Sequence, residues 1–284
     1  MSVDLIKPYF KLAKPGMVLG NLLPAVAGYL LASDLKIKLL SFIALLIGTA
    51  LIMGAACSVN NLIDRDIDSK MDRTKNRPSV KGQVDLTNSI IYVGILMVIG
   101  FGSLLLWVNI LCAVIGAIGF IDYAFIYTLL KRRTHHATLV GSIAGAMPVV
   151  GAYAAYSDRI NLVAITVGLM MLLWQMPHFY AIALYRGNDY RSSNVPVLPL
   201  VKGHEYTVRA MVLYSLLFFI SVIMLYFVAK LNLAYLVVMG LAVAGWSLFN
   251  LHGLKLNQLE VWAKRSFIYS LIVMITMSLM VAVR

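Results

Sequence analysis

Four aspartates lie within nine residues, directly after a long apolar run that carries no charge. The run covers residues 39–59, and the aspartates are Asp64, Asp66, Asp68 and Asp72. If the apolar helix continues, Asp64, Asp68 and Asp72 join Asn60 at every fourth position and share one helix face. Carboxylates placed in this way repel one another unless a cation lies against them, and hard oxygen ligands suit Mg²⁺. The pattern predicts a Mg²⁺ site at the mouth of this helix, with the metal shared between the protein and substrate phosphates.

Basic residues alternate with these aspartates and follow them. They are Arg65, Lys70, Arg73, Lys75 and Arg77, and a second basic group, Lys131, Arg132 and Arg133, closes a later apolar run. Guanidinium and ammonium groups bind phosphate oxygens, so both groups are candidates for holding the remaining phosphate charge. The alternative is that these charges only mark the cytoplasmic side of a membrane protein. The Asn–Asp–Asp ladder favours the functional interpretation, whereas the group at 131–133 alone fits both interpretations equally well.

Most of the chain belongs in a bilayer. Of its 284 residues, 61% are hydrophobic and 13% are charged, which excludes an ordinary soluble domain. The net charge of +12 indicates topology and contact with anionic lipid headgroups, and we expect no nucleic-acid partner. Cys57 and Cys112 lie in apolar runs and are expected to be small buried hydrophobes. The first residues show neither the pattern of a cleavable signal nor that of an organelle transit peptide, which favours the plasma membrane of a prokaryote.

The sequence predicts an all-α, polytopic membrane protein with about nine transmembrane helices in a single domain, residues 1–284. The apolar runs that could span a bilayer cover roughly 17–33, 39–61, 88–108, 110–130, 138–156, 160–184, 208–229, 233–251 and 267–283. Lys14, Pro15 and Gly16 precede the first run and fit an amphipathic segment that lies at the membrane interface.

The distribution of Lys and Arg predicts the orientation. All but five of the 24 lie in the N-terminal segment or in the connections after the second, fourth, sixth and eighth spans. The exceptions are Lys36, Lys38, Arg159, Lys230 and Arg284. Because cytoplasmic loops are enriched in Lys and Arg, we expect the N-terminus in the cytoplasm and the C-terminus outside.

Two of the cytoplasmic connections are much longer than the others, and each carries acidic and basic residues together. They cover about 62–87 and 185–207, and each follows an even-numbered helix. Long polar connections in a compact bundle are usually functional or disordered, and Pro196 and Pro199 stiffen the second one. Their matching positions suggest two four-helix halves plus a final helix, with the active site on the cytoplasmic side.

A polar pair interrupts the sixth span. Gln175 and His178 flank Pro177 inside an otherwise apolar run. Polar groups at membrane depth cost free energy and usually line a cavity, although a histidine that packs between helices is the alternative. Gly141 and Gly145 in the fifth span allow helices to approach closely, or line a cavity for a long chain.

Taken together, these motifs resemble the UbiA superfamily of intramembrane prenyltransferases. The first acidic motif of that superfamily is Asn-Asp-x-x-Asp-x-x-x-Asp, and residues 60–68 match it with Asn61 in place of the first Asp. One branch of the superfamily transfers farnesyl groups to haem. Its hallmarks are similar to KPGMVLGN at 14–21, NNLIDRDIDSKMDRTKNRP at 60–78, LWQMPHFYAIA at 173–183 and DYRSSNVPVLPLVKG at 189–203. Other members carry a second Asp-x-x-x-Asp motif, whereas here Asp189 is followed by Ser193, which agrees with the haem branch.

The resemblance implies a reaction. Farnesyl diphosphate would bind with Mg²⁺ between the two acidic loops, and loss of diphosphate would leave an allylic carbocation in an apolar cavity. The 2-vinyl group of haem B would attack this carbocation, and water would quench the resulting cation, giving haem O. The implied partners are these two substrates and membrane lipid, and contact with a terminal oxidase assembly or a haem A synthase is a further expectation.

The resemblance also implies roles for individual residues. The metal ligands would be Asn60, Asp64, Asp68 and Asp189, of which the three aspartates count as catalytic. The residues that bind the diphosphate or haem would be Arg73, Arg77, Lys131, Arg132, Gln175, Asn194 and Lys202. His178 would be a catalytic contact to haem, through the iron, a propionate or the reacting vinyl group.

Two alternatives stay open at this point. The first is a UbiA-type transferase that acts on a quinone precursor or a lipid; the Trp-Gln-Met-Pro-His stretch and the missing second acidic motif argue against it. The second is a cation channel or transporter with an acidic vestibule. Against it, the charges gather at one membrane face and no continuous acidic path runs through the predicted helices.

Overall fold

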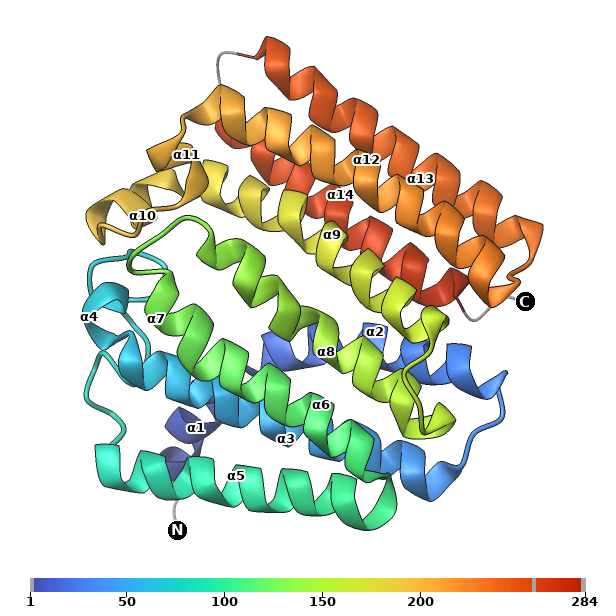
Figure 1. Ribbon diagram of the computed structural model, residues 1–284. Coiled ribbons are helices and arrows are strands. Elements are labelled where there is room, and N and C mark those ends of the chain that lie inside the picture. The colour runs from blue at the N-terminus through green and yellow to red at the C-terminus, as the bar shows by residue number, and fades with distance from the viewer. Residues whose placement is uncertain (1–2, 257–258, 282–284) are drawn as a thin grey trace.

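The computed structural model describes residues 3–256 and 259–281, and every regular element in these ranges is a helix (Figure 1). The elements are α1 (Val3–Leu12), α2 (Pro15–Ser33), α3 (Leu39–Ile63), α4 (Arg65–Asp68), α5 (Leu86–Trp107), α6 (Ile110–Ile121), the π-helix η1 (Asp122–Tyr127), α7 (Thr128–Leu130), α8 (Ala137–Ser157), α9 (Leu162–Tyr185), α10 (Gly187–Ser192), α11 (Leu198–Val201), α12 (His204–Ala229), α13 (Leu233–His252), the 3₁₀-helix η2 (Gly253–Lys255) and α14 (Leu259–Met280).

Nine helical segments of the described chain are long and apolar enough to cross a membrane, as the sequence predicted. They are α2, α3, α5, the continuous run α6–η1–α7, α8, α9, α12, the run α13–η2 and α14. Large apolar side chains cover their outer faces; Val98 is 75% exposed and Leu241 is 71% exposed. A helix satisfies its own backbone hydrogen bonds, so these apolar surfaces can face lipid without leaving unpaired polar groups.

Polar side chains fix where several spans begin. Asp85 accepts a hydrogen bond from the backbone N–H of Asn88 at the start of α5. Asn109, Asn161 and Asn232 cap α6, α9 and α13 in the same way. These side chains satisfy backbone donors that a helix start leaves free. The observed spans therefore begin within a few residues of the predicted ones, except that α12 and α14 each begin earlier than predicted, at His204 and Leu259.

The helices form two halves that meet along α2, α8, α9 and α14. In the first half α3 packs against α5 and α2 packs against α8; in the second half α9 packs against α12 and α14. Contacts of α14 with both α9 and α2 join the end of the chain to its beginning. The division into two four-helix halves plus a final helix stays a prediction, because the fifth span, α8, packs against α2 and α6 as well as against α9. Arg284 and residues 282–283, which the sequence assigned to the outer side and to the last span, lie outside the described residues.

Both long connections lie at one end of the bundle (Figure 1, left), where α4, α10 and α11 gather. The backbone N–H of Asp72 donates to Oδ1 of Asp189 at 2.9 Å, and Oγ of Ser192 donates to the carbonyl oxygen of Lys70 at 2.8 Å. The two loops are therefore in direct contact, as a shared site requires.

Candidate active site

The acidic ladder continues past the end of α3, but not as far as predicted. Asn60, Asp64 and Asp68 are buried, with 2%, 1% and 4% of their surfaces exposed. The backbone keeps nearly helical bonding through Asp64, because the N–H of Asp68 donates to the carbonyl oxygen of Asp64 at 2.8 Å. Asp72 does not extend the ladder: the chain turns after α4, and the Asp72 side chain is 89% exposed and paired with Lys75.

Cations of the chain itself neutralise Asp64. The Lys131 ammonium, one residue past the end of α7, donates to Oδ2 of Asp64. The Arg132 guanidinium lies 3.5 Å from Oδ1 of the same carboxylate. A carboxylate that is 1% exposed needs such partners, since a buried unpaired charge is very costly.

Arg132 also holds Asp66. Its two terminal nitrogens donate to the two carboxylate oxygens of Asp66 at 2.8 and 2.7 Å, and one of them also donates to the carbonyl oxygen of Ile63 at 2.8 Å. These hydrogen bonds lower the pKa of Asp66 and raise that of Arg132. Arg132 therefore clamps the chain where α3 passes into α4.

Asp68 has a separate cation. Nη1 of Arg77 donates to Oδ2 of Asp68 at 2.5 Å. The hydroxyl of Thr74 donates to the backbone oxygen of Asp68 at 2.9 Å, so the loop after α4 folds back over the carboxylate. Both buried carboxylates of the ladder are thus charge-balanced by the protein alone.

Asn60 connects the ladder to the N-terminal segment. Nζ of Lys14 donates to Oδ1 of Asn60 at 2.6 Å, and Nδ2 of Asn60 donates to Oδ2 of Asp64 at 2.7 Å and to the hydroxyl of Thr128 at 2.9 Å. Lys14 has a left-handed backbone with φ 52°, which turns the chain between α1 and α2. Desolvation lowers the pKa of Lys14 to about 8. A cation that the sequence placed in an interfacial segment before the first span therefore reaches the candidate metal ligands.

The π-helix η1 places two aromatic rings beside these cations. The hydroxyl of Thr128 donates to the carbonyl oxygen of Tyr123 at 2.8 Å, where the helix is wider than an α-helix. The rings of Tyr123 and Tyr127 are stacked with centroids 5.5 Å apart. The Lys14 and Lys131 ammonium groups lie 5.9 and 5.4 Å from the centroids of Tyr123 and Tyr127 respectively. Gly141 makes room for the Tyr127 ring, since a Cβ at position 141 would lie 2.5 Å from Cδ2 of Tyr127.

Two residues of the second loop, Asp189 and Tyr190, lie near the first loop or its neighbouring cations. Asp189 contacts the first loop through the backbone of Asp72, so in this structure it joins the loops. Burial raises the pKa of Tyr190 to about 12, although the charges of Arg73 and Lys131 act in the opposite direction. Tyr190 therefore lies near Arg73 of the first loop and near Lys131, which follows α7.

Three predicted binding residues make no side-chain contact with the buried carboxylates among the described residues. Arg73 is exposed beside the tyrosines. Asn194, with φ 57°, lines an open depression of the second loop, and Lys202 is exposed after α11. To bind the diphosphate or haem, as predicted, these three residues would have to contact a part of the ligand that lies away from the ladder.

Gln175 and His178 occupy a different place, in the middle of the bundle, and Pro177 does not interrupt α9. Nε2 of Gln175 donates to the carbonyl oxygen of Ser142 at 3.0 Å, and a Cβ at Gly145 would overlap Oε1 of Gln175. Gln175 thus joins α9 to α8. His178 is 8% exposed and faces α14, where its Nδ1 lies 2.7 Å from Oγ of Ser270.

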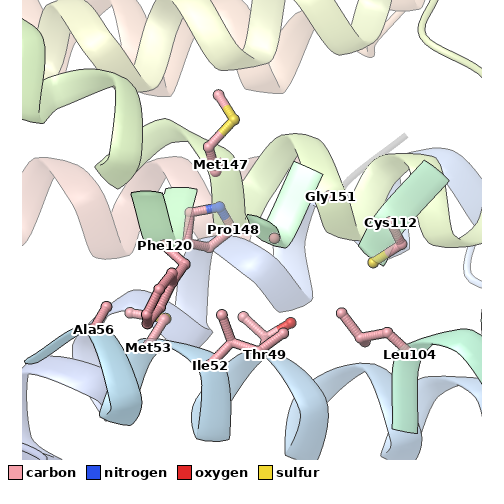
Figure 2. Close-up of a pocket in the computed structure, with 11 residues that line it drawn as sticks. Thr49, Ile52, Met53, Ala56, Leu104, Cys112, Phe120, Met147, Pro148 and Gly151 are labelled. Atoms are coloured by element: carbon pink, nitrogen blue, oxygen red, sulfur yellow. The ribbon is translucent and has the colours of Figure 1, made fainter. Parts of the chain in front are cut away.

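An apolar cavity of about 50 Å³ lies between α3, α5, α6 and α8 (Figure 2). Ala56 lines the cavity four residues before Asn60, so it shares a face of α3 with the ladder at a distance of about 6 Å along the axis. Figure 2 shows Ala56 and Phe120 at one end, and Leu104 and Cys112 at the other. Apolar space therefore lies beneath the ladder and the cations that pair with it, Lys131 and Arg77, which together form the charged mouth of the site.

The ladder fits Mg²⁺ by the chemistry of its donors. Asn60, Asp64 and Asp68 offer hard oxygen atoms, and no cysteine or histidine contacts them among the described residues. Their carboxylates are occupied by Lys131 and Arg77, so the metal would enter together with an anion that draws these cations away.

Sequence reasoning missed several parts of the site. Lys14 carried a weak signal, because it precedes a proline at the start of the first span. Thr128, Tyr123 and Tyr190 carried none, since a tyrosine or threonine near a helix end is ordinary. Asp122 is a buried carboxylate in η1 that accepts a hydrogen bond from the backbone N–H of Ala144 at 3.0 Å; a single acid inside an apolar run was a signal that could have been used.

Comparisons with known proteins agree with the predicted family. The model of the UbiA prenyltransferase family matches residues 21–272. Protoheme IX farnesyltransferase 2 of Pseudomonas fluorescens is 40% identical over 279 residues, which cover 98% of this chain and 95% of that protein. Protoheme IX farnesyltransferase of Yersinia pseudotuberculosis is 39% identical over 280 residues, with the same two coverages.

Solved structures share the fold. A structure described as digeranylgeranylglyceryl phosphate synthase in membranes has a TM-score of 0.79 and 16% identity, covering 99% of this chain and 98% of that one. A UbiA homolog from Archaeoglobus fulgidus, bound to GPP and Mg²⁺, has a TM-score of 0.69 and 16% identity, covering 97% of this chain and 100% of that one. At these identities the likeness concerns the fold alone.

Proposed function

Because this chain belongs to the UbiA prenyltransferase family, we propose that it transfers a farnesyl group from farnesyl diphosphate to the 2-vinyl group of haem B. The C1–O bond of farnesyl diphosphate breaks, diphosphate leaves, and the vinyl group forms a new carbon–carbon bond to C1. Water adds to the resulting cation and releases a proton, which gives the hydroxyethylfarnesyl side chain of haem O. The observation that carries the choice of acceptor is the 40% identity, along 98% of the chain, to proteins named for this reaction.

The charged mouth suits the departure of diphosphate. Mg²⁺, when bound, would neutralise the diphosphate and make it a better leaving group. Asn60, Asp64 and Asp68 would hold the metal, and the cations that now pair with the two aspartates would turn to the phosphate oxygens. This exchange of partners keeps every buried charge balanced both with and without substrate.

The donors to diphosphate come from three segments of the chain. Lys131 and Arg77 are freed from the ladder, and Lys14 lies 2.6 Å from Asn60 Oδ1. Arg73 and Arg132 are further candidates because they border the same mouth. Asp189 would close the second loop over the site, or hold a metal, and its hydrogen bond from the backbone of Asp72 supports a role where the two loops meet.

The carbocation would be stabilised by aromatic faces. The rings of Tyr123 and Tyr127 lie beside the ammonium groups of Lys14 and Lys131. Aromatic faces attract cations, and the same faces become available when these lysines turn to the diphosphate. The farnesyl chain would extend down α3 toward the apolar cavity that Ala56 lines.

His178 would contact haem from the middle of the bundle, where α9 faces α14, and Gln175, Asn194 and Lys202 are further candidates for haem contacts. The loops would face the cytoplasm, with the N-terminus inside, because of the Lys and Arg distribution. We expect the plasma membrane of a prokaryote as the location, and a terminal oxidase assembly or haem A synthase as candidate partners.

The test is incubation of the purified protein with haem B, farnesyl diphosphate and Mg²⁺, followed by mass analysis of the porphyrin. The expected product carries one farnesyl group and one added water. A protein that leaves haem unchanged but farnesylates a quinone precursor would contradict the proposal and support the alternative acceptor class. His178→Ala should impair haem binding and change farnesyl diphosphate affinity by less than about threefold, roughly 0.7 kcal/mol. Asp64→Asn should do the reverse.

A further inference from the structure

Ser270 on α14 is held by two residues of α9. Its backbone oxygen accepts a hydrogen bond from the indole N–H of Trp174 at 2.9 Å. Its hydroxyl oxygen lies 2.7 Å from Nδ1 of His178. The imidazole is stacked on the Trp174 ring, with centroids 4.8 Å apart, and the Phe267 ring lies on another side at 5.0 Å. The position and the orientation of the imidazole are therefore both defined.

The hydroxyl proton of Ser270 decides which ring nitrogen of His178 carries hydrogen. Oγ of Ser270 donates to the carbonyl oxygen of Phe267 at 2.5 Å. A serine hydroxyl has a single proton, so toward His178 this oxygen can only accept. The contact at 2.7 Å is then a bond from the N–H at Nδ1, and the neutral ring carries no hydrogen at Nε2.

Nε2 of His178 has no hydrogen-bond partner among residues 3–256 and 259–281. Its neighbours are aromatic rings and a hydroxyl, which offer the ring no countercharge. An unprotonated Nε2 has a lone pair and no proton to donate. It cannot bond to an ionised propionate, which also only accepts, and it has nothing to offer a vinyl group. Of the three haem contacts considered, the iron is therefore the one that such a nitrogen suits.

We propose that Ser270 is a positioning residue that fixes His178 in the tautomer with Nδ1 protonated, so that Nε2 is presented to the iron of haem. This inference rests on the proposed function, in which haem is the acceptor substrate. It selects the iron from the three haem contacts that the sequence left open. Partners that orient a metal-binding histidine typically affect metal affinity by 10- to 100-fold when they are removed.

The first experiment reads the tautomer without any substrate. ¹⁵N-histidine-labelled protein in lipid nanodiscs gives separate NMR signals for protonated and unprotonated ring nitrogens, and a His178→Gln variant identifies the signals of this ring among the five histidines. We expect Nδ1 protonated and Nε2 unprotonated. A signal for protonated Nε2, or for a doubly protonated ring, in the unchanged protein would overturn the inference.

The second experiment is a titration with ferric haem, followed by the Soret band. His178→Ala should lose the spectrum of histidine ligation. Ser270→Ala should weaken haem binding by 10- to 100-fold, and Ser270→Thr, which keeps the hydroxyl, should restore most of it. Ser278→Ala is the matched control: Ser278 is also buried on α14, but within the described part of the chain its hydroxyl bonds only to the carbonyl oxygen of Met274, so haem binding should not change.

The outcomes separate this inference from the proposed function. If the protein farnesylates haem but His178→Ala keeps the unchanged Soret spectrum, the inference is wrong and the proposed function stands. If Ser270→Ala and Ser278→Ala weaken haem binding equally, Ser270 has only a packing role. If the protein farnesylates another acceptor, the proposed function is wrong, and the titration still decides whether His178 binds haem iron, because it needs no farnesyl diphosphate.

Discussion

The side-chain amide of Asn61 donates to the backbone oxygen of Leu12 at 2.8 Å, and both residues are buried. This bond ties the end of α1 to the last turn of α3, one residue from Asn60. It explains why the position carries Asn where the superfamily motif has Asp, because an ionised carboxylate cannot donate to a carbonyl. Asn61 therefore holds the N-terminal segment against α3, and the candidate ladder begins at Asn60.

Asn61→Asp should consequently destabilise the protein even though it restores the superfamily residue. The change removes a donor, leaves the Leu12 oxygen unpaired and buries a charge, which we expect to cost about 1–3 kcal/mol or more. Thermal unfolding in detergent measures it. Asn76→Asp is the control, because Asn76 is exposed in the loop after α4 and the change should leave the unfolding temperature nearly unchanged. Equal stability of both variants would show that the bond to Leu12 contributes little.

Removal of a single charge from the ladder should strongly lower turnover. Asp64→Asn and Asp68→Asn keep the shape of the side chain but remove a metal ligand, and we expect each to lower turnover by roughly 10²-fold or more. Asp66→Asn is the matched control, since Asp66 is 63% exposed and its pair with Arg132 is a surface interaction worth about 1 kcal/mol or less. Chelation should abolish activity and Mg²⁺ should restore it. Near-normal turnover of correctly folded Asp64→Asn and Asp68→Asn would leave the ladder without a catalytic role.

Lys14 should make farnesyl diphosphate binding depend on pH. With its pKa lowered to about 8, Lys14 is charged below that pH and loses its charge as the pH rises through it. The contribution to diphosphate binding is therefore present at pH 7 and lost toward pH 9, by tenfold or more if a charge-assisted hydrogen bond of about 1.5 kcal/mol disappears. Binding of labelled farnesyl diphosphate across this range measures the effect. Lys14→Arg, which stays charged, should flatten the profile; identical profiles would contradict the assignment.

The candidate site was predictable from the sequence where chemistry and helical period coincide. Asn60, Asp64 and Asp68 follow a four-residue spacing that the helical backbone preserves through α4. Asp72 has the same spacing, but it is exposed because the chain turns after α4. The spacing of the aspartates does not predict that turn. Lys14 and Ser270 could not be found by spacing at all: Lys14 reaches Asn60 across 46 residues, and Ser270 reaches His178 across 92. Contacts of this kind depend on how distant helices pack, which a local pattern does not encode.

The orientation in the membrane can be tested by labelling single cysteines. Thr74 and Ser193 lie centrally in the two loops, but they are only 1% and 6% exposed, so cysteines at these positions would react poorly from either side. Asn76 and Asn188 are exposed and serve better. We expect cysteines at both to react with an impermeant maleimide only when the cytoplasmic face is accessible; Cys57 and Cys112 are buried and should stay silent. Labelling of either loop in intact cells would contradict the cytoplasmic site.

The apolar cavity beneath the ladder should limit the length of the prenyl chain. Cys112 and Leu104 lie at the end farthest from Ala56, as Figure 2 shows, so a larger side chain at position 112 leaves less apolar space for a chain that enters from the ladder. Cys112→Leu should therefore lower turnover with farnesyl diphosphate by about tenfold or more, roughly 1.4 kcal/mol of lost apolar contact, and spare geranyl diphosphate. The readout is the mass of the modified porphyrin when both diphosphates compete. Gly102→Ala on α5 is the control, because a Cβ there meets no atom within 4 Å. If Cys112→Leu raises the unfolding temperature by filling the cavity and leaves the preference for farnesyl unchanged, the chain does not enter this cavity and must follow another face of the bundle.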